Sequence, residues 1–104
     1  MIEDDIIKEF IPAFKASCAK ILYKDYKMNQ KDIASILNIT QPAIHKYLKN
    51  KYSSKIRNIE NHIEKDNVIN FIENTLKKNQ YEAQRYVCKE CSRIIHIECV
   101  LKIK

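Results

Sequence analysis

Residues 30–49 read QKDIASILNITQPAIHKYLK, and their spacing predicts two short helices joined by a tight turn. Ala34 is small at the point where the second helix must pass closely over the first. Asn38 falls at the corner, which needs a left-handed backbone that Asn adopts more readily than most residues other than Gly. The chain contains no Gly. The apolar face of the first helix would consist of Ile33, Ile36 and Leu37.

The second helix of this pair has its own start signal and its own apolar seam. Thr40 is a suitable N-cap, and Pro42 falls in the first turn, where a missing N–H does little harm. Ile44 and Leu48 are four residues apart and would be buried together. The pattern therefore predicts a helix-turn-helix, a module that places its second helix in the major groove of DNA. The residues that remain exposed on this helix are Gln41, His45, Lys46 and Lys49.

A run of positive charge accompanies the second helix. Residues 42–57 contain five basic residues and no acidic one, whereas a merely solvated helix face usually mixes both signs. Clustered basic residues beside a recognition helix are typical of phosphate binding. In this interpretation Thr40 and the helix N-terminus anchor a phosphate, Gln41 and His45 reach base edges, and lysines clamp the backbone. The predicted DNA-binding residues are Gln30, Lys31, Thr40, Gln41, Pro42, His45, Lys46, Lys49 and Lys51.

Length and composition restrict the class of protein. The chain has 104 residues and a formal net charge of +6, which allows one modest core and suits an anionic partner. No apolar run approaches the roughly 20 residues of a membrane span, and the first residues are acidic, unlike a signal peptide. We therefore expect a cytoplasmic protein without membrane association. No paired carboxylates, Gly-rich phosphate loop or nucleophile triad stands out, so we expect no enzyme.

The rest of the chain predicts a mostly α fold. We expect a short leading helix, a longer helix from about Pro12 to Tyr26, and a long helix from Ser54 to Lys78 with a break near Asp66 and Asn67. From Arg93 onward apolar residues alternate with mostly polar ones, which favours a strand over a helix. The predicted division is a helix-turn-helix domain at 1–53, followed at 54–104 by the long helix and a small cysteine-bearing tail, a knuckle plus a strand, for dimerisation and metal binding.

Cysteines in the tail suggest a metal site. Cys88 and Cys91 have the C-x-x-C spacing that lets two thiolates converge on one cation, and Cys99 could be a third ligand. A fourth would come from Cys18, His96, a partner subunit or an exogenous group. Because an incomplete thiolate set suits a sensor, an iron-sulfur cluster is favoured over zinc. The alternatives are a Cys18 that is simply buried and tail cysteines that are plain thiols. On one unbroken helix Cys88 and Cys99 would lie about 16 Å apart, too far to share an ion.

Several stretches together resemble a known family. These are residues 11–20, MNQKDIASILNITQPAIHKYLKNKYSSKI at 28–56, CKECSR at 88–93, and Cys99. They resemble small archaeal transcriptional regulators of the Cro/repressor-like (XRE-type) helix-turn-helix class, some of which carry a thiamine-phosphate synthase-like domain behind the module. The resemblance implies a sequence-specific, dimeric regulator with Gln41 in the major groove. This chain departs from the pattern at Asn38, where the family usually has Gly, and no ligand-binding domain follows.

The sequence therefore predicts a DNA-binding transcriptional regulator of double-stranded DNA that forms a homodimer, with a metal-responsive or iron-sulfur-responsive cysteine tail. One alternative is a protein-interaction module that uses the helix-turn-helix only as a scaffold. Another is a thiol redox protein based on C-x-x-C, although that motif is not preceded by the βαβ pattern of such proteins. Salt dependence separates the first two, because DNA binding through several lysines weakens steeply with salt and an apolar interface does not.

Overall fold

The computed structural model describes the backbone of residues 2–103 and the side chains of residues 8–96. The described chain is mostly helical, as the sequence predicted, and contains no strand. Its helices, in order, are α1 (Ile2–Lys24), α2 (Gln30–Leu37), α3 (Gln41–Leu48), α4 (Ser54–Asn61), α5 (Lys65–Leu76) and α6 (Gln80–Ile103).

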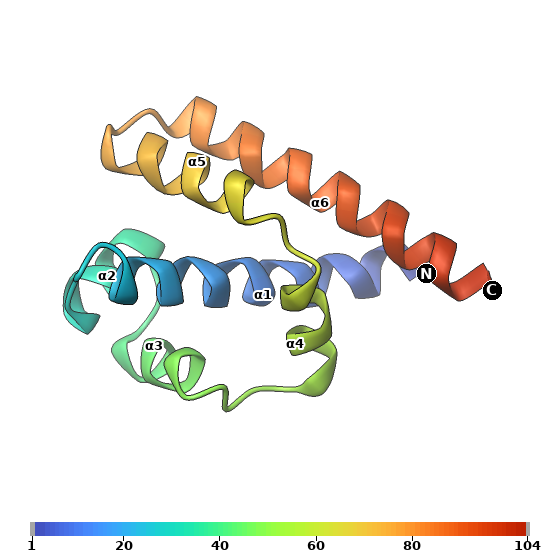
Figure 1. The fold of residues 1–104 in the computed structure, drawn as a ribbon, viewed down its shortest axis with the longest axis horizontal. Coiled ribbons are helices and arrows are strands. Elements are labelled where there is room, and N and C mark those ends of the chain that lie inside the picture. The colour runs from blue at the N-terminus through green and yellow to red at the C-terminus, as the bar shows by residue number, and fades with distance from the viewer. Residues whose placement is uncertain (1, 104) are drawn as a thin grey trace.

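Helix α1 runs through the middle of the molecule, with α3 and α4 on one side and the α5–α6 hairpin on the other (Figure 1). All five other helices contact α1. One hydrophobic core extends from Phe10 on α1 through Ile44 on α3 to Ile94 on α6. The ring centroids of Phe14 and Phe71 lie 5.2 Å apart in an edge-to-face arrangement, and this contact joins α1 to α5. This core includes residues from both sides of residue 53, where the sequence predicted a domain boundary. The boundary itself stays a prediction.

Helix α1 corrects the expectation of two separate helices before Tyr26. The helix is continuous from Ile2 to Lys24 and contains Pro12 in its interior. A proline inside a helix costs about 3 kcal/mol. On either side of Pro12, however, the side chains of Phe10 and Phe14 are buried, and burying one such ring contributes about 1.5–3 kcal/mol. Packing of the continuous apolar face therefore offsets the local penalty.

The long helix expected from Ser54 to Lys78 is divided in the structure. Helix α4 ends at Asn61 and α5 begins at Lys65, so the break lies a few residues before the expected position. The connecting residues direct α4 against α1, whereas α5 packs against both α1 and α6. The break thus separates the two layers that lie on opposite sides of α1.

The strand expected from Arg93 is wrong, because α6 continues as a helix to Ile103. Among its described side chains, the buried ones are Ala83, Val87, Glu90 and Ile94, which recur at helical spacing along one face. The alternation that suggested a strand begins only after this buried stripe, and no Gly or Pro ends the helix before it. Tertiary packing against α5 and α1 therefore decides the conformation.

Within residues 2–103, four residues have a left-handed backbone although none is Gly: Lys27, Asn38, Asn50 and Lys78, with φ between 55° and 61°. They follow the ends of α1, α2, α3 and α5. Each reverses the chain after a helix, the position where Gly is usual. A left-handed conformation costs an L-residue about 1–2 kcal/mol.

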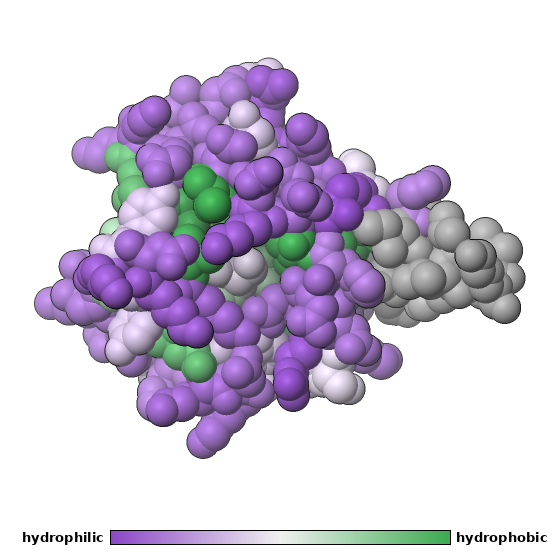
Figure 2. Space-filling view, viewed as in Figure 1, coloured by the Kyte–Doolittle hydropathy of each residue, from purple (hydrophilic) through white to green (hydrophobic). Residues whose placement is uncertain are grey.

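The face shown in Figure 2 is mostly hydrophilic, with apolar side chains visible only in separate patches. Within the described residues, no helix has both the length and the apolar composition to cross a membrane.

Candidate nucleic-acid interface

The α2–α3 pair has the local geometry that the sequence predicted. Asn29 caps α2, with its Oδ1 accepting a hydrogen bond of 2.8 Å from the Asp32 N–H. Asn38 takes the left-handed conformation at the corner, with φ 55° and ψ 48°. Directly after it, the Ile39 N–H donates to the Ala34 carbonyl at 3.0 Å, which closes the turn. The corner residue was thus correctly identified from its type alone.

The start of α3 also confirms its predicted signals. Thr40 is the N-cap, and its Oγ1 accepts a hydrogen bond of 3.3 Å from the Ala43 N–H. Pro42 lies in the first turn. Ile44 is fully buried and Leu48 is half-buried, so this seam fastens α3 to α1 and α2. The opposite face of the helix consequently points to solvent.

The predicted DNA-binding side chains are all accessible except Gln30, which is half-buried. Six of them lie on α3 or on the residues that follow it, and all six are exposed: Gln41, Pro42, His45, Lys46, Lys49 and Lys51. Lys31 is exposed near the start of α2. Among the described side chains, neither Lys46 nor Lys49 forms an ion pair with a carboxylate.

A groove of about 370 Å³ brings three of these residues together with side chains that the sequence interpretation missed. Gln30, His45 and Lys49 line it from α2 and α3. Lys20 and Lys24 line it from the last turns of α1. The two α1 lysines are four residues apart and so share a helix face, but only the tertiary packing places that face beside α3. Lys20 is paired with Glu60, so Lys24 is the residue of α1 that adds positive charge to the interface.

Lys20 also fixes the loop that follows α3. Its Nζ donates to Asn50 Oδ1 at 2.5 Å, to Tyr52 Oη at 2.8 Å and to Glu60 Oε2 at 2.7 Å. Tyr52 in turn donates to Glu60, and burial together with this hydrogen bond raises the pKa of Tyr52. The network joins α1, the α3–α4 loop and α4. Since Asn50 lies two residues after the end of α3, the network fastens this end of α3 to α1 and α4.

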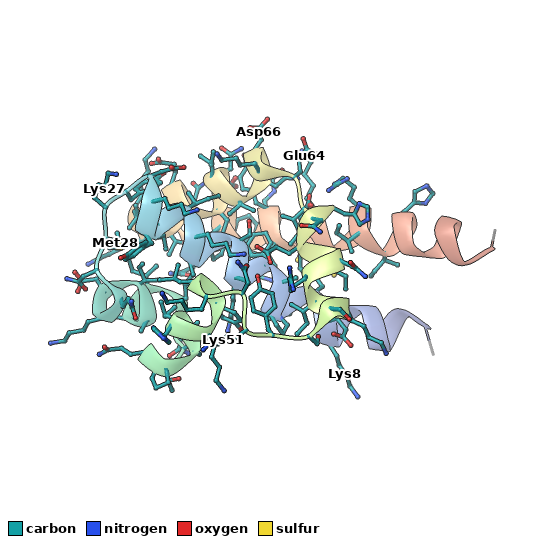
Figure 3. The ribbon with its side chains drawn as sticks, turned by 60° about the horizontal axis from the view of Figure 1, so that its bottom comes forward. Lys8, Lys27, Met28, Lys51, Glu64 and Asp66 are labelled. Carbon is teal, nitrogen blue, oxygen red and sulfur yellow. The ribbon has the colours of Figure 1, made fainter. Side chains whose placement is uncertain are left out.

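Charge is distributed unevenly over the molecule. In the view of Figure 3, Lys51 lies on the side of α3, whereas Glu64 and Asp66 lie at the opposite side, near the start of α5. The acidic residues at the start of α5 therefore lie away from the lysine that follows α3 (Figure 3). A surface with one sign of charge attracts and orients an oppositely charged partner.

The predicted metal site combined Cys18 with three cysteines of the tail, and the structure describes the side chains of Cys18, Cys88 and Cys91. Cys18 is fully buried on α1, and burial raises the pKa of its thiol, which favours the interpretation of Cys18 as a core residue. Cys88 is exposed and Cys91 is half-buried on α6. Among the side chains that the structure describes, no three ligand-type residues cluster as a metal site.

Helix α6 also separates the predicted ligands along its axis. Cys88 and Cys99 are eleven residues apart on one continuous helix, which corresponds to about 16 Å. At this separation the two thiols cannot share a single ion within one chain, because the backbone between Cys91 and Cys99 is helical. The side chain of Cys99 lies outside the described residues, and His96, the alternative ligand, is exposed on the same helix.

Glu90 is the residue whose importance the sequence did not reveal. It lies between the two cysteines of C-x-x-C, yet it is fully buried. Its carboxylate accepts hydrogen bonds from the Glu64 N–H at 2.6 Å, from Asn67 Nδ2 at 2.7 Å and from Arg93 Nη2 at 2.7 Å. Burial alone would raise the pKa of Glu90, but the bonds from Arg93, Glu64 and Asn67 together hold it below the usual value.

The bond from Glu64 gives Glu90 a structural role. Glu64 is the N-cap of α5, and its own side chain makes no capping bond there. The carboxylate of Glu90 therefore caps α5 from a neighbouring helix. Arg93 extends the same contact by donating to the His62 carbonyl in the break after α4. Glu90 and Arg93 thus join α6 to the break between α4 and α5.

Comparison of the chain with protein-family models, with curated proteins and with solved structures gave no match.

Proposed function

We propose that this protein is a sequence-specific DNA-binding regulator that inserts α3 into the major groove. The observation that carries the proposal is the outward face of α3, where Gln41, His45, Lys46 and Lys49 are exposed while Ile44 on the opposite side is buried. A helix held in this way, with a polar and basic outer face, fits the groove in width and in charge.

Base reading is assigned to the beginning of α3. Gln41 is the first residue of the helix and His45 lies one turn later on the same side. A Gln amide can bond an adenine edge through both its oxygen and its nitrogen. The Thr40 hydroxyl already accepts a bond from Ala43, but its hydrogen can still be donated to a phosphate oxygen.

Backbone binding is assigned to the lysines on both sides of this helix. Lys46, Lys49 and Lys51 belong to the end of α3 and the loop behind it. Lys24 adds a charge from α1 on the far side of the groove that His45 and Lys49 line. Phosphate contacts of this kind set the position of the protein on the duplex and provide most of the non-specific affinity.

A regulator of this type would act in the cytoplasm as a homodimer. One helix-turn-helix covers little DNA, whereas two recognition helices about 34 Å apart would read successive major grooves on one face of the duplex. The resemblance to XRE-type regulators supports the same assembly. The α5–α6 hairpin, which lies on the other side of α1 from α3, leaves the DNA-binding face free (Figure 1).

The proposal is tested by the salt dependence of binding to random-sequence duplex DNA, measured by fluorescence anisotropy. We expect a steep loss of affinity with salt, and we expect Lys46→Ala and Lys49→Ala each to lower the slope by about one unit. Lys89→Ala, on the exposed side of α6, is the matched control and should leave the slope unchanged. Binding that hardly responds to salt would contradict the proposal and favour a protein-interaction module.

Specific recognition needs a selected site. After selection of a preferred duplex from a random pool, Gln41→Ala should weaken binding to that duplex by about 1–3 kcal/mol and leave random-sequence binding nearly unchanged. An equal loss on both duplexes would show that Gln41 does not read bases.

A further inference from the structure

Two thiols lie one helical turn apart on α6. Cys88 is exposed and Cys91 is half-buried. Side chains three residues apart on a helix have Cβ atoms about 5–6 Å from each other. Zinc binds thiolate sulfur at about 2.3 Å, so both sulfur atoms can reach one ion between them.

The orientation of this pair is fixed by the buried side of α6. Val87 and Ile94 are in the core, and Glu90 is held by Glu64, Asn67 and Arg93. Successive residues are rotated by about 100° around a helix, so Cys88 lies about 160° around α6 from Glu90. The anchor that holds Glu90 inward therefore holds Cys88 outward. A ligand on such a rigid element keeps its position without a metal.

Zinc binds the thiolate form of cysteine. A divalent ion between the two sulfur atoms reduces the repulsion between their negative charges. Binding then displaces one proton from each thiol.

We propose that Cys88 and Cys91, together with the same two residues of a second copy of this chain, form one tetrahedral four-thiolate site for a zinc-type divalent ion. The site joins the α6 helices of two subunits. This inference rests on the dimer of the proposed function and names its contact. It replaces the predicted single-chain ligand set, in which Cys88 and Cys99 lie too far apart on α6.

The occupant of this face is a second copy because the ligand count requires it. A closed zinc site takes four ligands, and the pair provides two, while the described side chains add no third ligand. In a two-fold dimer the same patch meets itself, so each subunit contributes an identical pair.

The surface around Cys88 is also open enough to receive another helix. A shallow groove of about 600 Å³ lies beside Cys88, lined among others by Tyr81, Gln84 and Ser92. The ring of Tyr81 is 77% exposed beside this groove. The α6 helix of a second copy would cover this ring while bringing its own cysteines to the ion.

The test is a titration of the reduced, metal-free full-length protein with cobalt(II), the spectroscopic substitute for zinc, under anaerobic conditions. We expect the spectrum of tetrahedral four-thiolate cobalt, with an end point of one ion per two chains. Light scattering should show that the ion favours the dimer, with a chelator raising the dimer dissociation constant at least tenfold. Cys88→Ser and Cys91→Ser should each abolish the four-thiolate spectrum. Cys18→Ala and Cys99→Ser are the matched controls and should retain it.

Four results would overturn the inference. These are an end point of one ion per chain, a dimer insensitive to chelator, a dimer that separates only with a thiol reductant, and loss of the spectrum in Cys99→Ser. Sulfide and iron in the anaerobically purified protein would likewise replace the single ion with a cluster. Non-specific DNA binding by the natural protein keeps the two proposals distinguishable. If its affinity falls steeply with salt while the cobalt titration of the natural protein gives no four-thiolate site, the metal contact is rejected and the DNA-binding proposal stands.

Discussion

The α2–α3 turn and the junction around Glu90 are both polar sites that hold helices in place, but they are built in different ways. At the turn, Asn38 and Thr40 act on backbone groups within a few residues of themselves. At the junction, Glu90 binds groups 23 and 26 residues away in the sequence. The contacts at the turn join residues that are close in the sequence, whereas the contacts at the junction join residues that come together only when the chain folds. The two sites should therefore respond differently to substitution.

The largest effect is expected at the junction. Glu90→Ala leaves the Glu64 N–H and the Asn67 amide without their buried partner and removes the ion pair to Arg93, which should destabilise the protein by about 3 kcal/mol. Urea unfolding followed by circular dichroism measures this change. Glu82→Ala on the same helix, which removes a surface pair to Arg85, is the control and should change little. Equal shifts in the two variants would mean that the junction is no more important than a surface ion pair.

A smaller effect is expected at the turn. In Asn38→Ala the backbone at the corner must still be left-handed, but Ala adopts this conformation less readily than Asn. The substitution should therefore destabilise the protein by about 1–2 kcal/mol. Asn38→Gly should be close to neutral, since Gly adopts this conformation freely. The same urea measurement distinguishes the variants. If Ala and Gly behaved alike, the corner would not be held in the left-handed conformation.

The smallest effect is expected from pH. The pKa of Glu90 is held below the usual value, so its contribution to stability is complete above the ordinary glutamate pKa of about 4.3 and is lost as the pH falls through the folded value. The net effect is small because burial and hydrogen bonding shift this pKa in opposite directions. Urea unfolding at a series of acidic pH values should show a steeper loss for the natural protein than for Glu90→Gln. Parallel curves would remove Glu90 from the acid response.

The contrast between the two sites also explains which parts of the molecule the sequence could predict. The corner, the cap and the buried seam of α3 depend on residue type at short spacing, and all three were predicted correctly at Asn38, Thr40 and Ile44. The exposed face of α3 followed from the same helical period. Its function is still a prediction, because exposure does not identify a ligand.

Errors occurred where distant contacts overrule local preference. Pro12 suggested a helix start, but the core on both sides of it keeps α1 continuous. The alternation after Arg93 suggested a strand, but α6 was already packed against α5. The roles of Lys20 and Glu90 were not predicted from the sequence. Their bonds cross from one helix to another, and no spacing within the sequence could have revealed them.

The absence of glycine has a consequence for how the molecule opens. At Lys27, Asn38, Asn50 and Lys78 the chain turns through a conformation that resists L-residues, so the ends of four helices store strain. The unfolded chain, however, lacks the extra freedom that Gly would give it and loses less entropy on folding. Strain at the boundaries and stiffness in the unfolded state act in opposite directions on the global equilibrium. Strain is released when a helix end opens, so it favours local fraying at these positions. Amide hydrogens beside Lys27 and Lys78 should therefore exchange early, while the helix interiors stay closed.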